Sequence, residues 1–172
     1  MGYYTVGAPF RMRAAPSDGG PLPLAYHVGG EGREWRNPVL VAARGTPMRV
    51  TLDNALAEPT IVHWHGLRID GANDGNGDRV AAPGGRFEYA FDVANRAGTY
   101  WYHPHPHGLT AGQAHRGLFG VMLVDDADDR ALNAALRTAR GVTDLVLVLS
   151  DRRTGARGLY APTAGDRVNG YL

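Results

Sequence analysis

The stretch Gly98–Gly120, GTYWYHPHPHGLTAGQAHRGLFG, decides how the chain is interpreted. It places His103, His105 and His107 at every second position. Residues i and i+2 of an extended strand point to the same face, so neighbouring histidines can direct their rings at one place. The prolines between them favour extended backbone and cannot donate hydrogen bonds to a sheet. The pattern therefore predicts a stiff segment on the solvent side or at the edge of a sheet, rather than a central strand.

A second pair lies earlier, in His63-Trp64-His65-Gly66. With His103 and His105 it supplies four imidazoles, and the chain has no cysteine, so the ligand set is rich in nitrogen. Such a set suits copper, zinc, iron or nickel. Four ligands exceed what one simple site with an open position uses, which favours a cluster of several metal ions. The alternative, that each histidine is a hydrogen-bonded polar residue of a sheet, suits a lone histidine better than two such pairs.

The motifs His63–Gly66 and Trp101–His105 resemble the two N-terminal copper-binding motifs of the multicopper oxidases, the laccase-like family. The resemblance is greatest to bacterial three-domain members and covers most of the chain from about Pro38 onward. It implies that His63 ligates the type 2 copper and that the type 3 pair is ligated by His65, His103 and His105. His107 lies one step beyond the motif and is not assigned as a ligand, and His115 is expected to be structural.

Enzymes of this family take single electrons from a small reducing substrate at a type 1 copper that has a cysteine ligand. They reduce dioxygen to water at a trinuclear copper cluster held by eight histidines. The resemblance implies that this chain gives half of those histidines. Because the chain has no cysteine, the type 1 copper, the cysteine and the other histidines are expected in a C-terminal remainder of the oxidase. Phenols, aromatic amines or metal ions are the implied substrates, and the implied location is extracytoplasmic.

Short apolar segments separated by glycine and proline turns predict an all-β sandwich. Arg86–Val93 is the clearest strand, because aromatic and aliphatic residues alternate there with polar ones. The resemblance makes the sandwich a cupredoxin-like Greek key with one short helix. Residues 1–140 are then a first cupredoxin domain, and residues 141–172 begin a second. Strands are expected at 3–14, 24–28, 38–42, 48–53, 61–67, 86–93, 98–103, 118–124 and 144–149, and the helix at 126–140.

Other features narrow the function. A net charge of +1 gives no reason to expect a nucleic-acid partner, and the chain has no apolar run of about 18 residues, the length of a membrane span. His27 is expected at the surface or an edge. The loop Asp70–Asp78, DGANDGNGD, partly imitates a calcium loop but lacks its bidentate glutamate; the resemblance implies that it shapes the approach to the cluster. Asp78 and backbone carbonyls are candidates for orienting the ligand rings.

Two other functions fit the histidine pairs. One is a stand-alone copper-binding module without turnover. The other is a zinc hydrolase, which the sequence disfavours because His107 stands where such enzymes would need an aspartate.

Overall fold

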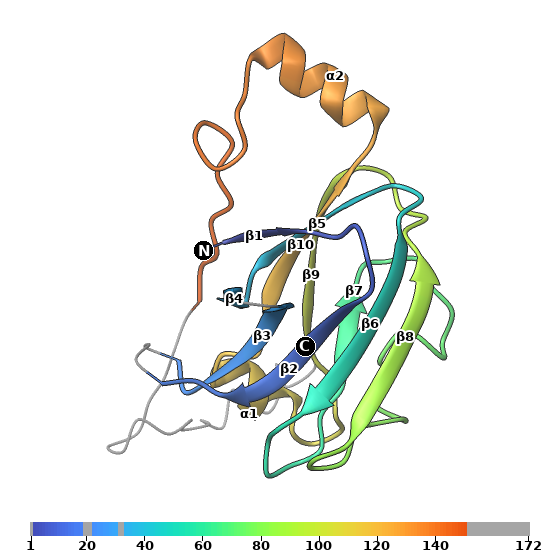
Figure 1. Cartoon of the computed structure of the whole chain (residues 1–172), viewed down its shortest axis with the longest axis vertical. Coiled ribbons are helices and arrows are strands. Elements are labelled where there is room, and N and C mark those ends of the chain that lie inside the picture. The colour runs from blue at the N-terminus through green and yellow to red at the C-terminus, as the bar shows by residue number, and fades with distance from the viewer. Residues whose placement is uncertain (1, 19–21, 31–32, 151–172) are drawn as a thin grey trace, which may run out of the picture.

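The computed structural model describes residues 2–18, 22–30 and 33–150, which form two packed five-stranded sheets (Figure 1). The first sheet has the strand order β1-β5-β10-β9-β7, and the second has the order β4-β3-β2-β6-β8. The strands are β1 (Tyr3–Thr5), β2 (Phe10–Pro16), β3 (Leu24–Gly30), β4 (Arg33–Arg36), β5 (Val39–Ala43), β6 (Pro47–Asn54), β7 (Val62–His65), β8 (Arg86–Asp92), β9 (Gly98–Pro104) and β10 (Gly120–Asp125). Parallel pairs, such as β2 with β6 and β5 with β10, join strands distant in sequence. The predicted all-β sandwich is confirmed.

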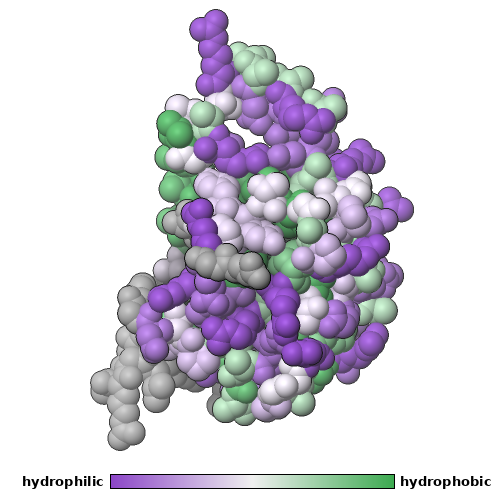
Figure 2. Space-filling view, in the orientation of Figure 1, coloured by the Kyte–Doolittle hydropathy of each residue, from purple (hydrophilic) through white to green (hydrophobic). Residues whose placement is uncertain are grey.

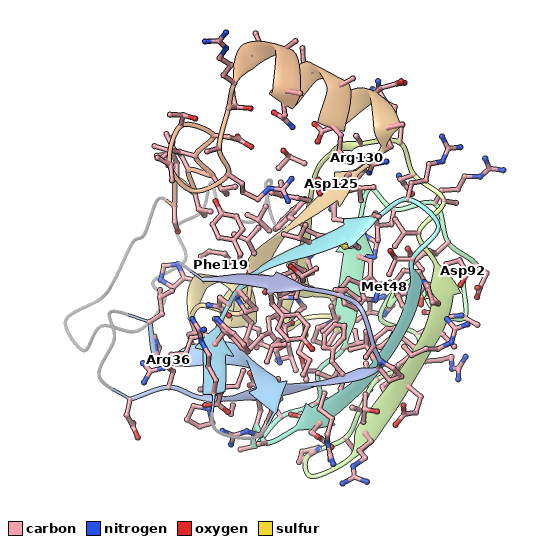
Figure 3. The ribbon with its side chains drawn as sticks, turned by 45° about the horizontal axis from the view of Figure 1, so that its top comes forward. Arg36, Met48, Asp92, Phe119, Asp125 and Arg130 are labelled. Atoms are coloured by element: carbon pink, nitrogen blue, oxygen red, sulfur yellow. The ribbon has the colours of Figure 1, made fainter. Side chains whose placement is uncertain are left out.

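The core lies between the two sheets and follows the alternation of the strands. In β8, Tyr89 and Phe91 point inward, while the residues that alternate with them, Glu88, Ala90 and Asp92, are exposed. In β6, Met48, Val50 and Leu52 are fully or almost fully buried. Figure 3 shows side chains filling the space between the sheets. Each large apolar side chain buried in this way contributes about 1.5–3 kcal/mol, so the sandwich is held mainly by this layer.

The outer face of the first sheet carries a smaller apolar cluster. Val39 and Val41 of β5 pack there beside Val121 and Leu123 of β10, and Tyr3 and Val146 pack against them. Both faces of β10 are therefore covered. This explains why its sequence, GVMLVD, is apolar without alternation.

Two helices lie outside the sheets, whereas the sequence predicted one. The predicted helix is α2 (Ala127–Leu136), which begins where the Asp126 carboxylate accepts a hydrogen bond from the backbone N–H of Asp129. It ends at Arg137, which has a left-handed backbone with φ of 53°. In Figure 1, α2 lies beyond one end of the sandwich. Figure 2 shows the molecular surface from the same side, where hydrophilic residues predominate. The additional helix is α1 (Thr110–His115).

Three expectations about strands are wrong. Residues 3–14 form two strands, β1 and β2, in different sheets. The segment 144–149 is not a strand: Val146 packs on the first sheet, but Leu145, Leu147 and Leu149 are exposed. No strand was predicted at the position of β4. The rest of the predicted second domain, residues 151–172, lies outside the described residues, and neither helix in the described part is long and apolar enough to cross a membrane.

Candidate metal centre

The two histidine pairs meet where β7 pairs antiparallel with β9. The pairing places His63 opposite His103 and His65 opposite Trp101. β9 lies between β10 and β7, so the preference for an edge segment over a central strand is wrong for His103, which lies on β9; β7 is the edge strand. Pro104 is tolerated because it is the last residue of β9, where a missing N–H removes little of the ladder.

Alternation along these strands separates the core from the site. Trp64 and Tyr102 are fully buried in the main core, between the two sheets. Their neighbours in sequence therefore lie on the outer face of the first sheet. The site is built on that outer face, at the β7 edge, with His103 buried and His65 exposed.

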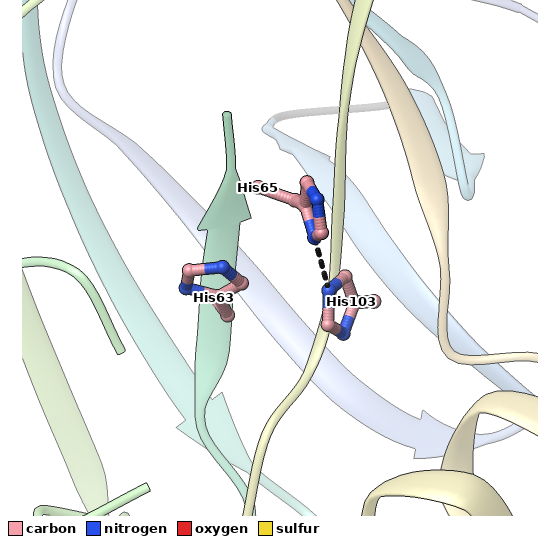
Figure 4. Close-up of side chains that lie close together, drawn as sticks. All are labelled: His63, His65 and His103. Atoms are coloured by element: carbon pink, nitrogen blue, oxygen red, sulfur yellow. Dashed lines mark hydrogen bonds between the residues drawn. The ribbon is translucent and has the colours of Figure 1, made fainter. Parts of the chain in front are cut away.

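Three rings converge there (Figure 4). One ligand atom from each of His63, His65 and His103 lies within 4.8 Å of the others. His65 Nδ1 is 3.2 Å from His103 Nε2. Two nitrogens that bind the same ion at about 2.0 Å in tetrahedral geometry are about 3.3 Å apart, so this spacing suits two ligands of one metal ion.

His105 lies beside this group without belonging to it. The centre of its ring is 5.2 Å from that of His63 and 6.0 Å from that of His103. Its Nδ1 is buried and has no hydrogen-bond partner among the described residues. A buried polar atom without a partner is costly, and a metal ion or a water molecule would satisfy it. All four histidines singled out from the sequence are thus brought together.

Backbone carbonyls orient two of the rings. The Nδ1–H of His63 donates to the carbonyl oxygen of Asp74 at 2.8 Å, and the Nδ1–H of His103 donates to that of Pro104 at 2.9 Å. A carbonyl oxygen only accepts, so both rings have a bare Nε2 when neutral. Of the candidates that the sequence offered, backbone carbonyls orient these two rings, and within the loop the carbonyl belongs to Asp74 rather than to Asp78. The carboxylate of Asp74 lies 3.5 Å from His63 Nδ1.

The loop Asp70–Asp78 packs closely against the site. Gly75 has φ of +74°, and a Cβ there would lie 1.9 Å from the carbonyl oxygen of Val62. Gly77 has φ of +89°, and its Cβ would lie 2.3 Å from the carbonyl oxygen of His105. The glycines therefore let the loop reach β7 and the second histidine pair. This explains a composition that resembles a calcium loop.

The environment favours neutral imidazoles. Burial lowers the pKa of His103 to about 4, and the nearby rings of His63, His65 and His105 act in the same direction. Burial, followed by the charge that His63 can carry, also lowers the pKa of His65. Neutral imidazole is the form that binds metal. The site is thus prepared for a metal ion before one binds.

A buried polar network, which the sequence did not predict, ties α1 to the segment that leads into β7. Gln113 of α1 is fully buried and accepts a hydrogen bond from the Thr60 hydroxyl at 2.8 Å. Its amide donates to the Pro59 carbonyl and to the Glu58 carboxylate, which also pairs with Arg116. The network therefore links the two chain segments that carry the histidine pairs. The sequence carried no signal for this network, because no helix was predicted around Gln113.

The other histidines are placed away from the group of three. His107 is exposed, and its ring centre is 6.4 Å from that of His105. His115 is the last residue of α1. The prediction for His27 is wrong: it is 7% exposed on the inner strand β3, and its Nδ1 lies 2.9 Å from a carboxylate oxygen of Glu34.

Comparison with known proteins decides the family. The family described as "Multicopper oxidase" matches residues 26–129. The chain belongs to the multicopper oxidase family. Multicopper oxidases bind copper, and three converging imidazoles fit that ion.

Comparisons with individual multicopper oxidases support this assignment. The chain is 38% identical over 115 residues to multicopper oxidase mco of Staphylococcus aureus, covering 67% of this chain and 25% of that protein. It superposes on the crystal structure of McoA from Aquifex aeolicus with a TM-score of 0.84 and 30% identity, over 94% of this chain and 37% of that one. The predicted cupredoxin-like fold is thereby confirmed. The chain spans about a quarter of the curated relative.

One relative has a different kind of name. Cell division protein FtsP of Sodalis glossinidius is 30% identical over 129 residues, which are 74% of this chain and 27% of that protein. Family membership alone therefore does not establish that this chain takes part in an oxidation. Support for an oxidase comes from the arrangement of the four histidines.

Proposed function

We propose that this chain is the N-terminal part of a laccase-like multicopper oxidase that reduces dioxygen to water while it oxidises a small reducing substrate in one-electron steps. The observation that supports the proposal is the convergence of His63, His65 and His103, with ligand atoms within 4.8 Å. In this proposal His63 holds the type 2 copper, and the type 3 pair is held by His65, His103 and His105. Copper, when bound, supplies the electron chemistry: it takes electrons singly and delivers four of them to dioxygen.

The chain's own residues hold and orient the ligands. Asp74 and Pro104 fix the rings of His63 and His103 through their carbonyl oxygens. Burial of His103 excludes water from one side of the site. The lowered pKa of His103 keeps that ring free of a competing proton at neutral pH.

The placement of the site supports a shared cluster. It lies on the outer face of the first sheet, and His65 is exposed rather than enclosed by this chain. A second surface that supplies further ligands can therefore approach. We propose that this surface belongs to a C-terminal remainder of the oxidase, which carries the type 1 copper with its cysteine and the other four histidines. The division into a first domain at 1–140 and a second that begins at 141, and the extracytoplasmic location, belong to the same proposal.

The substrate class proposed is phenolic or aromatic compounds or metal ions. The described residues give no basis for a choice among these substrates, because the type 1 site, where the substrate would give up its electrons, is proposed to lie elsewhere. The zinc hydrolase stays disfavoured, since Asp74, the acid next to the rings, lies on the Nδ1 side of His63 rather than among the converging ligand atoms.

The test is dioxygen uptake by the copper-loaded assembly that contains this chain, with a phenolic reductant in known amount. The proposal predicts one dioxygen consumed for four electrons supplied, and loss of uptake in a His103→Ala variant. Copper bound at the histidines without any uptake would instead support the stand-alone copper-binding module. Absence of bound copper would refute both.

A further inference from the structure

Trp101 and three histidines, His63, His65 and His103, form a group of four aromatic rings on the outer face of the first sheet. In the β7–β9 pairing, His63 faces His103 and His65 faces Trp101. The indole stacks on His103, with ring centres 4.1 Å apart and an interplanar angle of 29°. It also lies 4.9 Å from the ring centre of His65 at an angle of 33°. One indole therefore covers both rings whose nitrogens lie 3.2 Å apart.

The three converging rings are not held equally. His63 and His103 each have a backbone carbonyl on Nδ1. His65 directs its Nδ1 toward His103, and this is its one side-chain hydrogen bond within the part of the chain that the structure describes. It is also the exposed member of the group. Its ring plane is thus fixed by contacts with neighbouring rings, of which that with Trp101 has the shortest distance between ring centres.

We infer that Trp101 is a positioning residue that holds the ring of His65, so that Nδ1 rather than Nε2 points to the metal site. Aromatic faces attract one another in offset stacks, and a flat indole across an exposed ring hinders its rotation. Leucine at this position would supply apolar contact but no flat face. The inference rests on the proposed copper function for its consequence, but the orientation of His65 is a property of the metal-free chain.

The metal-free chain has an expected proton arrangement that can be measured. At pH 8 neutral imidazoles predominate, and His103 carries its proton on Nδ1, where it donates to Pro104. Its bare Nε2 then accepts a hydrogen bond from the Nδ1–H of His65. His65 is therefore expected as the Nδ1–H tautomer. When a metal ion binds at Nδ1, the proton must move to Nε2 of the same ring.

The experiment compares wild type, Trp101→Leu, Trp101→Phe and the control Trp35→Leu. Trp35 lies in β4 of the second sheet, is also half-buried, and packs on Arg33 of the same strand and on Tyr4 of β1. Long-range 1H–15N correlation of the metal-free chain reports the His65 tautomer, and titration with Cu²⁺ reports affinity. We expect W101L to lose the single Nδ1–H tautomer and to bind Cu²⁺ about tenfold more weakly, as when a partner that orients a ligand is lost. W101F should restore most of both properties, and W35L should change neither.

The possible outcomes are distinguishable. If W101L keeps the wild-type tautomer and affinity, the positioning role of Trp101 is wrong while the copper proposal stands. If wild type takes up no Cu²⁺, the copper proposal fails, and the tautomer comparison still decides the role of Trp101. If W101L does not fold, Trp101→Met, which conserves more volume without a flat ring, replaces it. Equal tautomer loss in W35L would show a general loss of stability and overturn the inference.

Discussion

His63 and His103 are 40 residues apart in sequence and face each other across the β7–β9 pairing, with ring centres 5.2 Å apart. The register of two strands, rather than a loop, thus sets the spacing of the candidate ligands. A shift of β7 by one residue would turn His63 and His65 into the core and bring Trp64 out, and a shift of β9 would do the same to His103 and Tyr102. The buried pair Trp64–Tyr102, with ring centres 6.0 Å apart, therefore fixes the site as well as the core.

Removal of His103 should abolish tight copper binding. The ring provides one of two nitrogens 3.2 Å apart, so we expect His103→Ala to weaken Cu²⁺ binding by more than about tenfold, since even a partner that only orients a ligand is worth that much. Equilibrium titration measures this. His107→Ala is the matched control, because His107 is exposed and lies outside the converging group, and it should bind copper as wild type does. A greater loss in H107A than in H103A would contradict the assignment.

The metal-free chain should lose stability on acidification. Burial lowers the pKa of His103 to about 4 from an ordinary value of 6.5, so the unfolded chain binds this proton first. Stability from this group is complete above pH 6.5 and is lost as the pH falls toward 4. The full effect is about 3 kcal/mol, of which about 2 kcal/mol disappears between pH 8 and pH 5. Urea unfolding at both pH values measures it.

A His103→Leu variant provides the control for this pH effect. It has no imidazole to protonate at this position, so its stability should change less between pH 8 and pH 5. The lowered pKa of His65 acts with the same sign and remains in the variant. An identical pH dependence in the two proteins would show that His103 is not held neutral by burial.

The approach of the 70–78 loop to β7 depends on Gly75. Alanine there would adopt φ of +74° and place its Cβ 1.9 Å from the Val62 carbonyl oxygen. Gly84→Ala is a matched control, because its φ is +73° and nothing lies within 4 Å of its Cβ. We expect about 1–2 kcal/mol of destabilisation for G84A from the backbone alone. G75A should cost clearly more, measured by urea unfolding, and should weaken Cu²⁺ binding because the Asp74 carbonyl moves; equal costs would refute the close approach.

The buried Gln113 should stabilise the fold through its partners. Gln113→Leu leaves the Thr60 hydroxyl and the Pro59 carbonyl without their partner, which costs about 1–3 kcal/mol for each buried group. Thr60→Val removes the hydroxyl as well, so the double variant should be less unstable than the sum of the single ones. A double-mutant cycle of urea unfolding measures this coupling. Additive effects would show that the 2.8 Å contact between the two side chains contributes nothing.

Sequence patterns correctly predicted the features that depend on residues close together in the chain. The alternation in Arg86–Val93 predicted β8, and the spacing of His63 with His65 and of His103 with His105 predicted two pairs on one face. The loop that orients His63 was also found. Backbone carbonyls were among the expected orienting groups, but the residue that supplies the carbonyl, Asp74, was not predicted, because a backbone group leaves no side-chain signature.

Sequence patterns did not predict the features that depend on contacts between residues far apart in the chain. The helix α1 has six residues and no capping side chain at Leu109, so its stability depends on the buried Gln113. His27 was expected at an edge because the short strand β4, with one half-buried residue, lacks alternation. The apolar segment 144–149 has the composition of a strand, but only Val146 packs on the first sheet. Composition does not supply the partner that a strand needs.

The most direct test is X-ray absorption at the copper edge of the copper-loaded chain. The proposed site predicts a first shell dominated by imidazole nitrogens at about 2.0 Å, unchanged in His107→Ala and reduced by one imidazole in His103→Ala. An oxygen-dominated shell, or one that the loss of His103 leaves unchanged, would contradict the claim that the strand pairing of β7 and β9 builds a copper centre.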